Sequence, residues 1–266
     1  MKKNPLKTLF ILLTITFSLG AWTFFNNTKP TLYIIGDSTV KNGDGTGKNG
    51  LWGWGDLISP YFDTTRISIE NHARGGRSSR TFITEGLWDK VLEKLKPGDF
   101  VIMQFGHNDG GPLNTGRARA SLKGSGEETQ EVVMEATGKK EVVHTYGWYM
   151  RKYITDAKAK GAISIVCSQI PRNIWNDGKV ERASDNYGKW AAEAANSAGA
   201  FFIDLNEIVA KKYEAIGQDT IKSKFFLEDH THTTWRGAEL NAASVVEGLQ
   251  EIKDCPLNQF LLKRPE

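Results

Sequence analysis

Five short, strongly apolar runs recur along the chain, each about as long as one buried strand. They limit the possible folds more than any other feature of the sequence, and they are residues 31–36, 66–71, 99–106, 162–169 and 200–205. Continuous apolar runs of this kind are typical of strands that are covered on both faces. Segments with a helical pattern separate them, at 52–60, 80–95, 145–160, 182–198 and 234–252. This alternation predicts an α/β fold with a parallel sheet between two layers of helices, where ligands bind beyond the carboxyl ends of the strands.

One stretch departs from this rhythm. Residues 110–143 are rich in Gly, Glu, Lys and Arg and are too long for a routine connection, so we expect a functional flap or a surface excursion there. No internal repeat and no linker is visible. We therefore expect a single domain over residues 30–256, followed by a C-terminal tail over residues 257–266.

The first 25 residues have the pattern of an export signal. A basic start, residues 1–7, precedes an uncharged apolar stretch, residues 8–25, which contains the small residues Gly20 and Ala21. This pattern predicts a signal peptide over residues 1–21 that is cleaved, and a secreted or periplasmic protein without stable membrane insertion. The alternative is an uncleaved membrane anchor that extends to about residue 25.

The charge balance changes with that cleavage. The whole chain has 34 Lys and Arg against 31 Asp and Glu, a net charge of +3, and three of the lysines belong to the signal. The remaining 31 basic residues would balance the 31 acidic ones, so composition does not favour a nucleic-acid partner. Two cysteines, Cys167 and Cys255, are too few for a disulfide framework, and we expect both to be free.

Residues that can act in catalysis follow successive predicted strands. Ser38 comes after the first run, Gly76 after the second and Asn108 after the third, while Asp229 and His232 precede the final helix. The carboxyl ends of parallel strands meet at one edge of a sheet, so these residues should lie close together. A serine hydroxyl needs a neighbouring base, and a carboxylate orients that base. Backbone N–H groups and an asparagine amide stabilise an oxyanion. Together they indicate acyl transfer.

These residues resemble the SGNH, or GDSL, hydrolase superfamily over nearly the whole mature chain. Four further stretches are similar to rhamnogalacturonan acetylesterases and related carbohydrate esterases: NHARGGRSSRTF (71–82), QFGHNDGG (104–111), SQIPRNIW (168–175) and DHTHTT (229–234). The resemblance implies a flavodoxin-like three-layer α/β/α sandwich with a five-stranded parallel sheet. It also implies a secreted esterase that removes acetyl groups from plant cell-wall polysaccharide, with rhamnogalacturonan or another pectin as substrate. Acetylated xylan or another acetylated glycan is the alternative.

The resemblance also implies roles for individual residues. Ser38 is the expected nucleophile, His232 its base and Asp229 the residue that orients the base. The family spacing of Asp, two residues and His selects His232 over His230. The oxyanion hole is expected to combine the backbone N–H groups of Ser38 and Gly76 with the Asn108 amide, and no cofactor or metal is implied.

Contacts with the substrate are predicted less directly. Arginines gather near the expected site in the sequence, and a guanidinium group suits the carboxylate of a uronic acid, so we expect some of them to recognise one. The candidates for substrate contact are Arg77, His107, Trp148 and Arg172, with Arg74 and Arg80 nearby.

Two alternative sites fit the sequence less well. Asp229, His230 and His232 would suit zinc, but no cluster of further ligands is apparent. Residues 45–50 contain a G-x-G-x-x-G pattern with Glu70 about 20 residues later, as in dinucleotide-binding proteins. Those glycines should follow the first strand at once, whereas here eight residues intervene.

A non-catalytic carbohydrate-binding protein is the alternative of a different class. Several aromatic residues near the predicted strand ends could stack on sugars: Trp52, Trp54, Trp148, Tyr149 and Trp175. Aromatic residues also dominate protein cores, so these positions alone do not distinguish packing from sugar binding.

Overall fold

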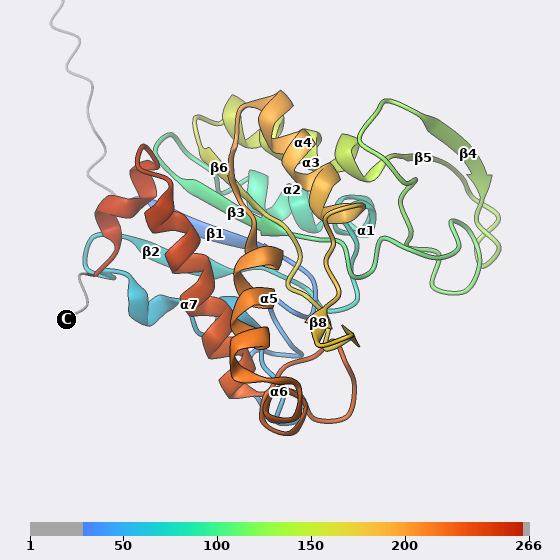
Figure 1. The fold of residues 1–266 in the computed structure, drawn as a ribbon. Coiled ribbons are helices and arrows are strands. Elements are labelled where there is room, and N and C mark those ends of the chain that lie inside the picture. Colours follow the sequence, from blue (N-terminus) through green and yellow to red (C-terminus); the bar gives the residue numbers. More distant parts are fainter. Residues whose placement is uncertain (1–28, 263–266) are drawn as a thin grey trace, which may run out of the picture.

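The computed structural model describes residues 29–262, so the predicted signal peptide lies outside the described residues. A five-stranded parallel sheet forms its centre in the order β2-β1-β3-β6-β9 (Figure 1). All five predicted strands are confirmed, the first with the expected bounds and the other four slightly shorter: β1 Thr31–Gly36, β2 Ser68–Asn71, β3 Phe100–Gln104, β6 Ile163–Cys167 and β9 Phe201–Ile203. β1 and β3 lie next to each other in the middle, with Ile34 opposite Ile102 and Ile35 opposite Met103.

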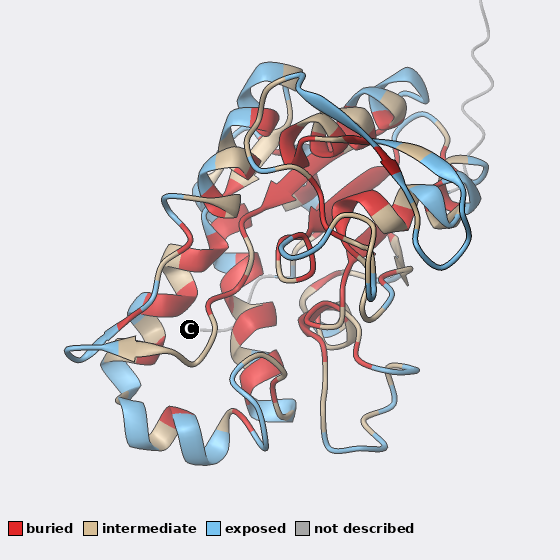
Figure 2. Ribbon diagram, turned by 90° about the vertical axis from the view of Figure 1, so that its right-hand side faces the viewer, coloured by how far each residue is buried: buried red, intermediate tan, exposed pale blue. Residues whose placement is uncertain are grey.

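Alternate strand residues point to opposite faces of the sheet, and each face has its own helical layer. Ile35 and Met103 pack in a cluster with residues of α1 Ser79–Thr84, α2 Leu87–Leu92, α3 Tyr146–Ala159 and α4 Tyr187–Ala198. Ile34 and Ile102 pack against residues of α5 Leu205–Ile216, α6 Gln218–Lys224 and α7 Trp235–Glu251. The buried residues follow the sheet and the inward helix faces (Figure 2). This is the expected three-layer sandwich.

Two predicted helices differ from the structure. The segment 80–95 is divided into α1 and α2 by Gly86, whose φ of 69° lies in the left-handed region. The segment 52–60 is not an α-helix but forms two 3-10 turns, η1 Trp54–Asp56 and η2 Ser59–Tyr61. Its backbone lies directly against the first strand's loop, because a Cβ on Gly53 would come within 2.2 Å of the carbonyl carbon of Val40. α5 and α6, between the last strand and the final helix, were not predicted.

Residues 110–143 form a surface excursion that contains an antiparallel hairpin, β4 Thr129–Val133 and β5 Lys140–His144. The hairpin projects from the sandwich at the upper right of Figure 1. Arg80 anchors the excursion, since its guanidinium pairs with Glu141 at 2.6 Å and donates to the carbonyl oxygens of Leu113 and Ala120 at 2.8 Å. Arg80 is 1% exposed, so the hypothesis that it recognises substrate is wrong.

The C-terminal segment also differs from prediction. After the short hairpin β7 Trp175–Asn176 and β8 Lys179–Val180 and the helices described above, the chain closes with η3 Pro256–Phe260. Leu257 and Phe260 are buried in the core, so the packed domain continues past residue 256 and the expected tail is shorter. Both cysteines are buried and free, as predicted. Within residues 29–262, no helix is long and apolar enough to cross a bilayer.

Candidate active site

A tight turn at the carboxyl end of β1 presents Ser38. Gly36 ends the strand where a Cβ would lie 2.5 Å from the Val40 side chain and 2.6 Å from the Gln104 carbonyl oxygen. Asp37 closes the turn, because its Oδ1 accepts hydrogen bonds from the Thr39 N–H at 2.8 Å and the Thr39 hydroxyl at 2.7 Å. Asp37 is fully buried, whereas Ser38 at the tip is half-buried.

Ser38 is linked to a histidine and a carboxylate from the other end of the chain. Its Oγ lies 2.9 Å from His232 Nε2, and His232 Nδ1 lies 2.6 Å from Asp229 Oδ2. The loop holds Asp229 in place because the backbone N–H groups of Thr231 and His232 both donate to its Oδ1 at 2.7 Å. Partial burial raises the pKa of Asp229, but the hydrogen bonds from His232 and Thr231 more than offset this and lower it to about 2. Asp229 is therefore a carboxylate at neutral pH and fixes the tautomer of His232.

Short antiparallel bridges position this loop against the turn of β1. Thr233 pairs with Trp52, whose N–H donates to the Thr233 carbonyl oxygen at 2.9 Å, and also with Phe226. The neighbouring residue Thr234 caps α7, since its side chain accepts from the Gly237 N–H. Of the two histidines in this loop, His232 faces Ser38, as we expected of the base. The other, His230, is exposed.

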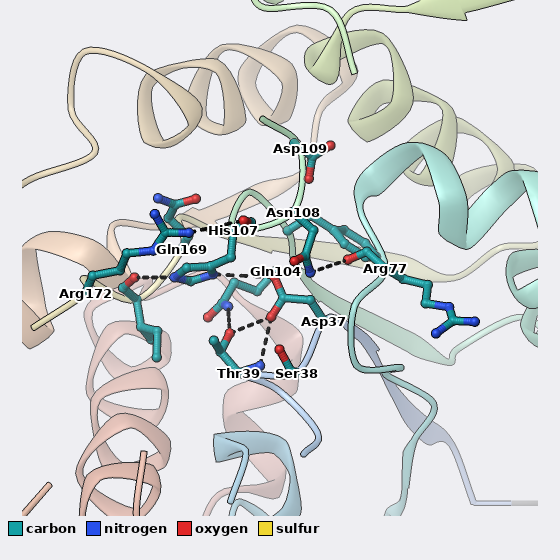
Figure 3. Close-up of polar contacts among 12 residues, drawn as sticks. Asp37, Ser38, Thr39, Arg77, Gln104, His107, Asn108, Asp109, Gln169 and Arg172 are labelled. Carbon is teal, nitrogen blue, oxygen red and sulfur yellow. Dashed lines mark hydrogen bonds and ion pairs between the residues drawn. The ribbon is translucent and has the colours of Figure 1, made fainter. Parts of the chain in front are cut away.

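Three hydrogen-bond donors surround the same serine. Within residues 29–262, the backbone N–H groups of Ser38 and Gly76 have no hydrogen-bond partner. The loop after β2 brings Gly76 close, because a Cβ on the adjacent Gly75 would lie 3.5 Å from Ser38 Cβ. The Asn108 amide lies on the next loop and donates to the Arg77 carbonyl oxygen at 2.9 Å (Figure 3). The structure thus brings together the three residues that the sequence placed after strands and the two that it placed before the final helix.

A buried polar network beneath Ser38 was not predicted. The Gln104 side chain donates to Thr39 Oγ1 at 2.6 Å (Figure 3) and accepts from Trp54 Nε1 at 2.9 Å. His107 Nε2 donates to the Ile170 carbonyl oxygen at 3.0 Å, and its Nδ1 lies 3.4 Å from Asp37 Oδ2. Burial alone would raise the pKa of Asp37, but His107 and the hydrogen bonds from Thr39 lower it. This network fixes the turn that presents the nucleophile.

The loop of Asn108 has its own buried anchor in Asp109. Asp109 accepts from the Ser79 N–H at 3.1 Å, from the Ser79 hydroxyl at 2.5 Å and from the Ser121 hydroxyl at 3.1 Å. It is fully buried, and this burial, with the negative charge of Asp37, raises its pKa to about 6 despite those donors. Asp109 therefore joins the Asn108 loop to the start of α1 and to the excursion.

The four residues that we expected to contact substrate lie in different parts of the structure. Arg77 lies beside Gly76 and pairs with Glu85 at 2.9 Å, while Arg172 donates to the His107 carbonyl oxygen at 3.2 Å. Arg172 also lines a polar pocket of about 300 Å³. The His107 side chain is only 2% exposed and acts mainly in the buried network, which differs from the free contact that we expected.

Trp148 lies apart from the other three candidates. It stacks on His144, with ring centroids 3.6 Å apart, and lines a separate hollow with residues of α3 and α4. No residue linked to Ser38 lines that hollow, so the structure does not bring Trp148 to the serine. In the described part of the chain, no three His, Cys, Asp or Glu side chains are grouped as a metal site requires.

Comparison with known proteins agrees with this geometry. The model of the GDSL-like lipase/acylhydrolase family matches residues 34–240, which is most of the chain. The chain belongs to this family. GDSL-like acylhydrolases cleave carboxylic esters, and this protein is a carboxylic ester hydrolase.

Two curated members of the GDSL-like family are similar over most of their length. Rhamnogalacturonan acetylesterase of Emericella nidulans is 35% identical over 219 residues, which cover 82% of this chain and 84% of that protein. Rhamnogalacturonan acetylesterase RhgT of Bacillus subtilis is 26% identical over 247 residues, 88% of this chain and 94% of that protein.

Solved structures share the GDSL-like fold. The YxiM protein of Bacillus subtilis superimposes with a TM-score of 0.69 at 24% identity over 86% of this chain; the match spans 58% of that longer chain. Axe2, an acetylxylan esterase from Geobacillus stearothermophilus, gives a TM-score of 0.55 at 14% identity over 83% of this chain and 94% of its own. At these identities the likeness concerns the fold alone.

Proposed function

We propose that this protein is a serine acetylesterase that removes acetyl groups from pectic polysaccharide, with acetylated rhamnogalacturonan as its preferred substrate. The observation that supports this most directly is the hydrogen-bonded series from Ser38 through His232 to Asp229, beside the N–H groups of Ser38 and Gly76, which have no partner among residues 29–262. The curated relatives that are named rhamnogalacturonan acetylesterases support the choice of polysaccharide. Acetylated xylan is the alternative glycan, but the similarity to an acetylxylan esterase is limited to the fold.

In this mechanism, Ser38 Oγ attacks the acetyl carbonyl carbon while His232 Nε2 accepts the hydroxyl proton. The negative charge that develops on the carbonyl oxygen is stabilised by the N–H groups of Ser38 and Gly76 and by the Asn108 amide. His232 then gives its proton to the departing sugar oxygen. Asp229, which stays ionised, stabilises the imidazolium.

The second half of the cycle repeats these steps with water. His232 accepts a proton from water, the resulting hydroxide attacks the acetyl group on Ser38, and acetate leaves as Ser38 recovers its proton. The Asn108 amide donates to the Arg77 carbonyl oxygen in this structure, so it must turn or share that hydrogen bond to reach the oxyanion.

Replacement of the serine tests the proposal. Ser38→Ala should lower kcat for 4-nitrophenyl acetate by at least about 10⁴-fold, because the other groups alone retain little catalysis. Ser223→Ala is a matched control, since Ser223 is exposed on α6. Circular dichroism checks that both variants fold. If Ser38→Ala keeps its rate, the proposed mechanism is wrong.

Acetate release from acetylated rhamnogalacturonan and from acetylated xylan then tests the substrate. A clear preference for rhamnogalacturonan supports the narrower proposal, and equal rates on both polymers contradict it.

The place of action is also part of the proposal. We propose that residues 1–21 direct export and are removed, so that the enzyme meets the polymer outside the cytoplasm. N-terminal sequencing of protein purified from the medium or periplasm should give a first residue just after Ala21. A chain that retains residues 1–25 and stays with the membrane would contradict this.

A further inference from the structure

A hollow of about 360 Å³ lies beside the proposed oxyanion hole and is rich in arginine. It is lined by Gly75, Gly76, Arg77, Thr81, Glu85, Arg117 and Arg119. Gly75 and Gly76 belong to the loop that lies against Ser38, so this hollow, which we call the arginine hollow, borders the reacting centre. Arg117 and Arg119 come from the surface excursion, far from the serine in the sequence.

The arginine hollow has more positive than negative charge. It contains three guanidinium groups and one carboxylate, and that carboxylate, Glu85, pairs with Arg77 at 2.9 Å. Neither Arg117 nor Arg119 forms an ion pair with any residue between 29 and 262, and the Arg117 side chain makes no hydrogen bond there either. Burial and the nearby charge of Arg117 lower the pKa of Arg119. The charges of Asp37 and Asp109 act in the opposite direction but do not offset this, so two neighbouring cations without an ion-pair partner cost free energy that an anion from outside would reduce.

The chain holds Arg119 in position rather than leaving it free in solvent. Its guanidinium donates to the Gly76 carbonyl oxygen at 3.0 Å, and its own carbonyl oxygen accepts from the Ser78 hydroxyl at 2.5 Å. Ala118, between the two arginines, has a φ of 47°, a left-handed conformation that is strained for a residue with a Cβ. The backbone thus keeps a strained turn that places both arginines beside the glycine loop.

We infer that the arginine hollow binds the carboxylate of a uronic acid residue that neighbours the acetylated sugar in the polymer. A planar guanidinium fork matches a carboxylate in a bidentate arrangement, which gives direction as well as charge. A carboxylate held by Arg117 and Arg119 would fix the polymer next to Ser38 without touching the acetyl group itself. The inference rests on the proposed function and specifies that function further, since a neutral acetylated glycan would leave these arginines unpaired.

The test compares two oligomers that differ only in the carboxylate offered to the hollow with a small ester that cannot reach it. They are an acetylated rhamnogalacturonan oligosaccharide, the same oligomer with its carboxylates methyl-esterified, and 4-nitrophenyl acetate. Acetate release is measured in each case, so cleavage of methyl esters is not counted. The wild type should have a higher kcat/KM for the carboxylated oligomer than for its methyl ester. That kcat/KM should also fall as salt rises, while the rate on 4-nitrophenyl acetate should not.

Substitutions of Arg117 and Arg119 test whether these two residues bind the carboxylate. Arg117→Gln should lower kcat/KM for the carboxylated oligomer about 3–10-fold, and the double variant with Arg119→Gln about 10–100-fold. Both should leave 4-nitrophenyl acetate and the methyl-esterified oligomer within about twofold. Lys253→Gln is the control, because it removes one exposed charge just beyond the far end of α7, a helix of 17 residues that is about 25 Å long and begins three residues after His232.

Distinct outcomes contradict the two proposals. Equal losses on all three substrates would mean that the arginines only support the Gly76 loop, and equal wild-type rates on the carboxylated and methyl-esterified oligomers would mean that no carboxylate is recognised. Either result overturns the inference but leaves the proposed function intact. If the wild type cleaves 4-nitrophenyl acetate but releases no acetate from any carbohydrate, the proposed function fails, and the inference fails with it.

Discussion

Asp109 should make the folded protein less stable as the pH rises from about 4 to about 7. Its folded pKa of about 6 lies above the ordinary value of 3.8, because the side chain is fully buried near Asp37. Between these two values the folded state binds the proton and the unfolded state has lost it, so each step up in pH favours unfolding. At about 1.4 kcal/mol for each tenfold change in proton affinity, the total is about 3 kcal/mol. The free energy of unfolding begins to fall near the pKa of Asp109 in the unfolded state. The decrease is complete once the pH exceeds the pKa of Asp109 in the folded state.

Urea unfolding of the wild type and of Asp109→Asn across this pH range measures the effect. The free energy of unfolding of the wild type, minus that of the variant, should fall by about 3 kcal/mol from low to neutral pH. The subtraction removes other groups that titrate, including Asp229, whose folded pKa lies near 2 and whose contribution is lost only in more acidic solution. A difference that stays constant, or that rises with pH, would refute the argument that burial dominates the hydrogen bonds from Ser79 and Ser121.

Three further substitutions test the site and its support. Asp229→Asn should lower kcat for 4-nitrophenyl acetate by about 10³–10⁴-fold because the amide favours the wrong tautomer of His232, and a loss below tenfold would contradict this role. Asn108→Ala should lower kcat by about 100-fold or more with little change in KM; an effect confined to KM would place Asn108 in binding. Arg80→Met should lower the free energy of unfolding by about 3 kcal/mol, as seen in urea, because it leaves Glu141 without its partner; no change would mean that the pair does not anchor the excursion.

The central sheet was predictable because its signal is local. Runs such as 31–36 and 162–169 are largely apolar on both faces, and a run of that length is typical of a doubly covered strand. The active-site order was predictable for a related reason: parallel strands place their following loops at one edge, so Ser38 and Asn108 must be neighbours once the sheet is known.

The unpredicted helix α5 had a signal in the sequence. Asp204 caps it by accepting from the Glu207 N–H, and Leu205, Val209 and Tyr213 form a buried stripe at helical spacing. The segment 52–60 was predicted to be a helix because of its apolar residues, but it does not form an α-helix. Its backbone at Gly53 lies tightly against the Val40 backbone. Close backbone contacts between distant segments have no local signal, and they override propensity.

Arg117 and Arg119 could not have been assigned to the site from sequence. They lie in a stretch without hydrophobic periodicity, and long-range contacts of Arg80, Ser78, Asp109 and Gly76 with the excursion bring them to the serine. Two arginines that lie closer to the expected site in the sequence do not line the arginine hollow. Arg80 is buried in an ion pair, and the Arg74 side chain is exposed with no partner in the described chain.

The hydrogen bond between Ser38 and His232 joins residues 194 positions apart. A ribosome that has released only the first 220 or so residues has already made Ser38, Gly76 and Asn108, but neither Asp229 nor His232. Contacts of such long sequence separation form late because they close the largest loops. On the proposed mechanism, we therefore expect the growing polypeptide to be inert toward esters during its synthesis and to acquire hydrolytic activity only when its last helix docks.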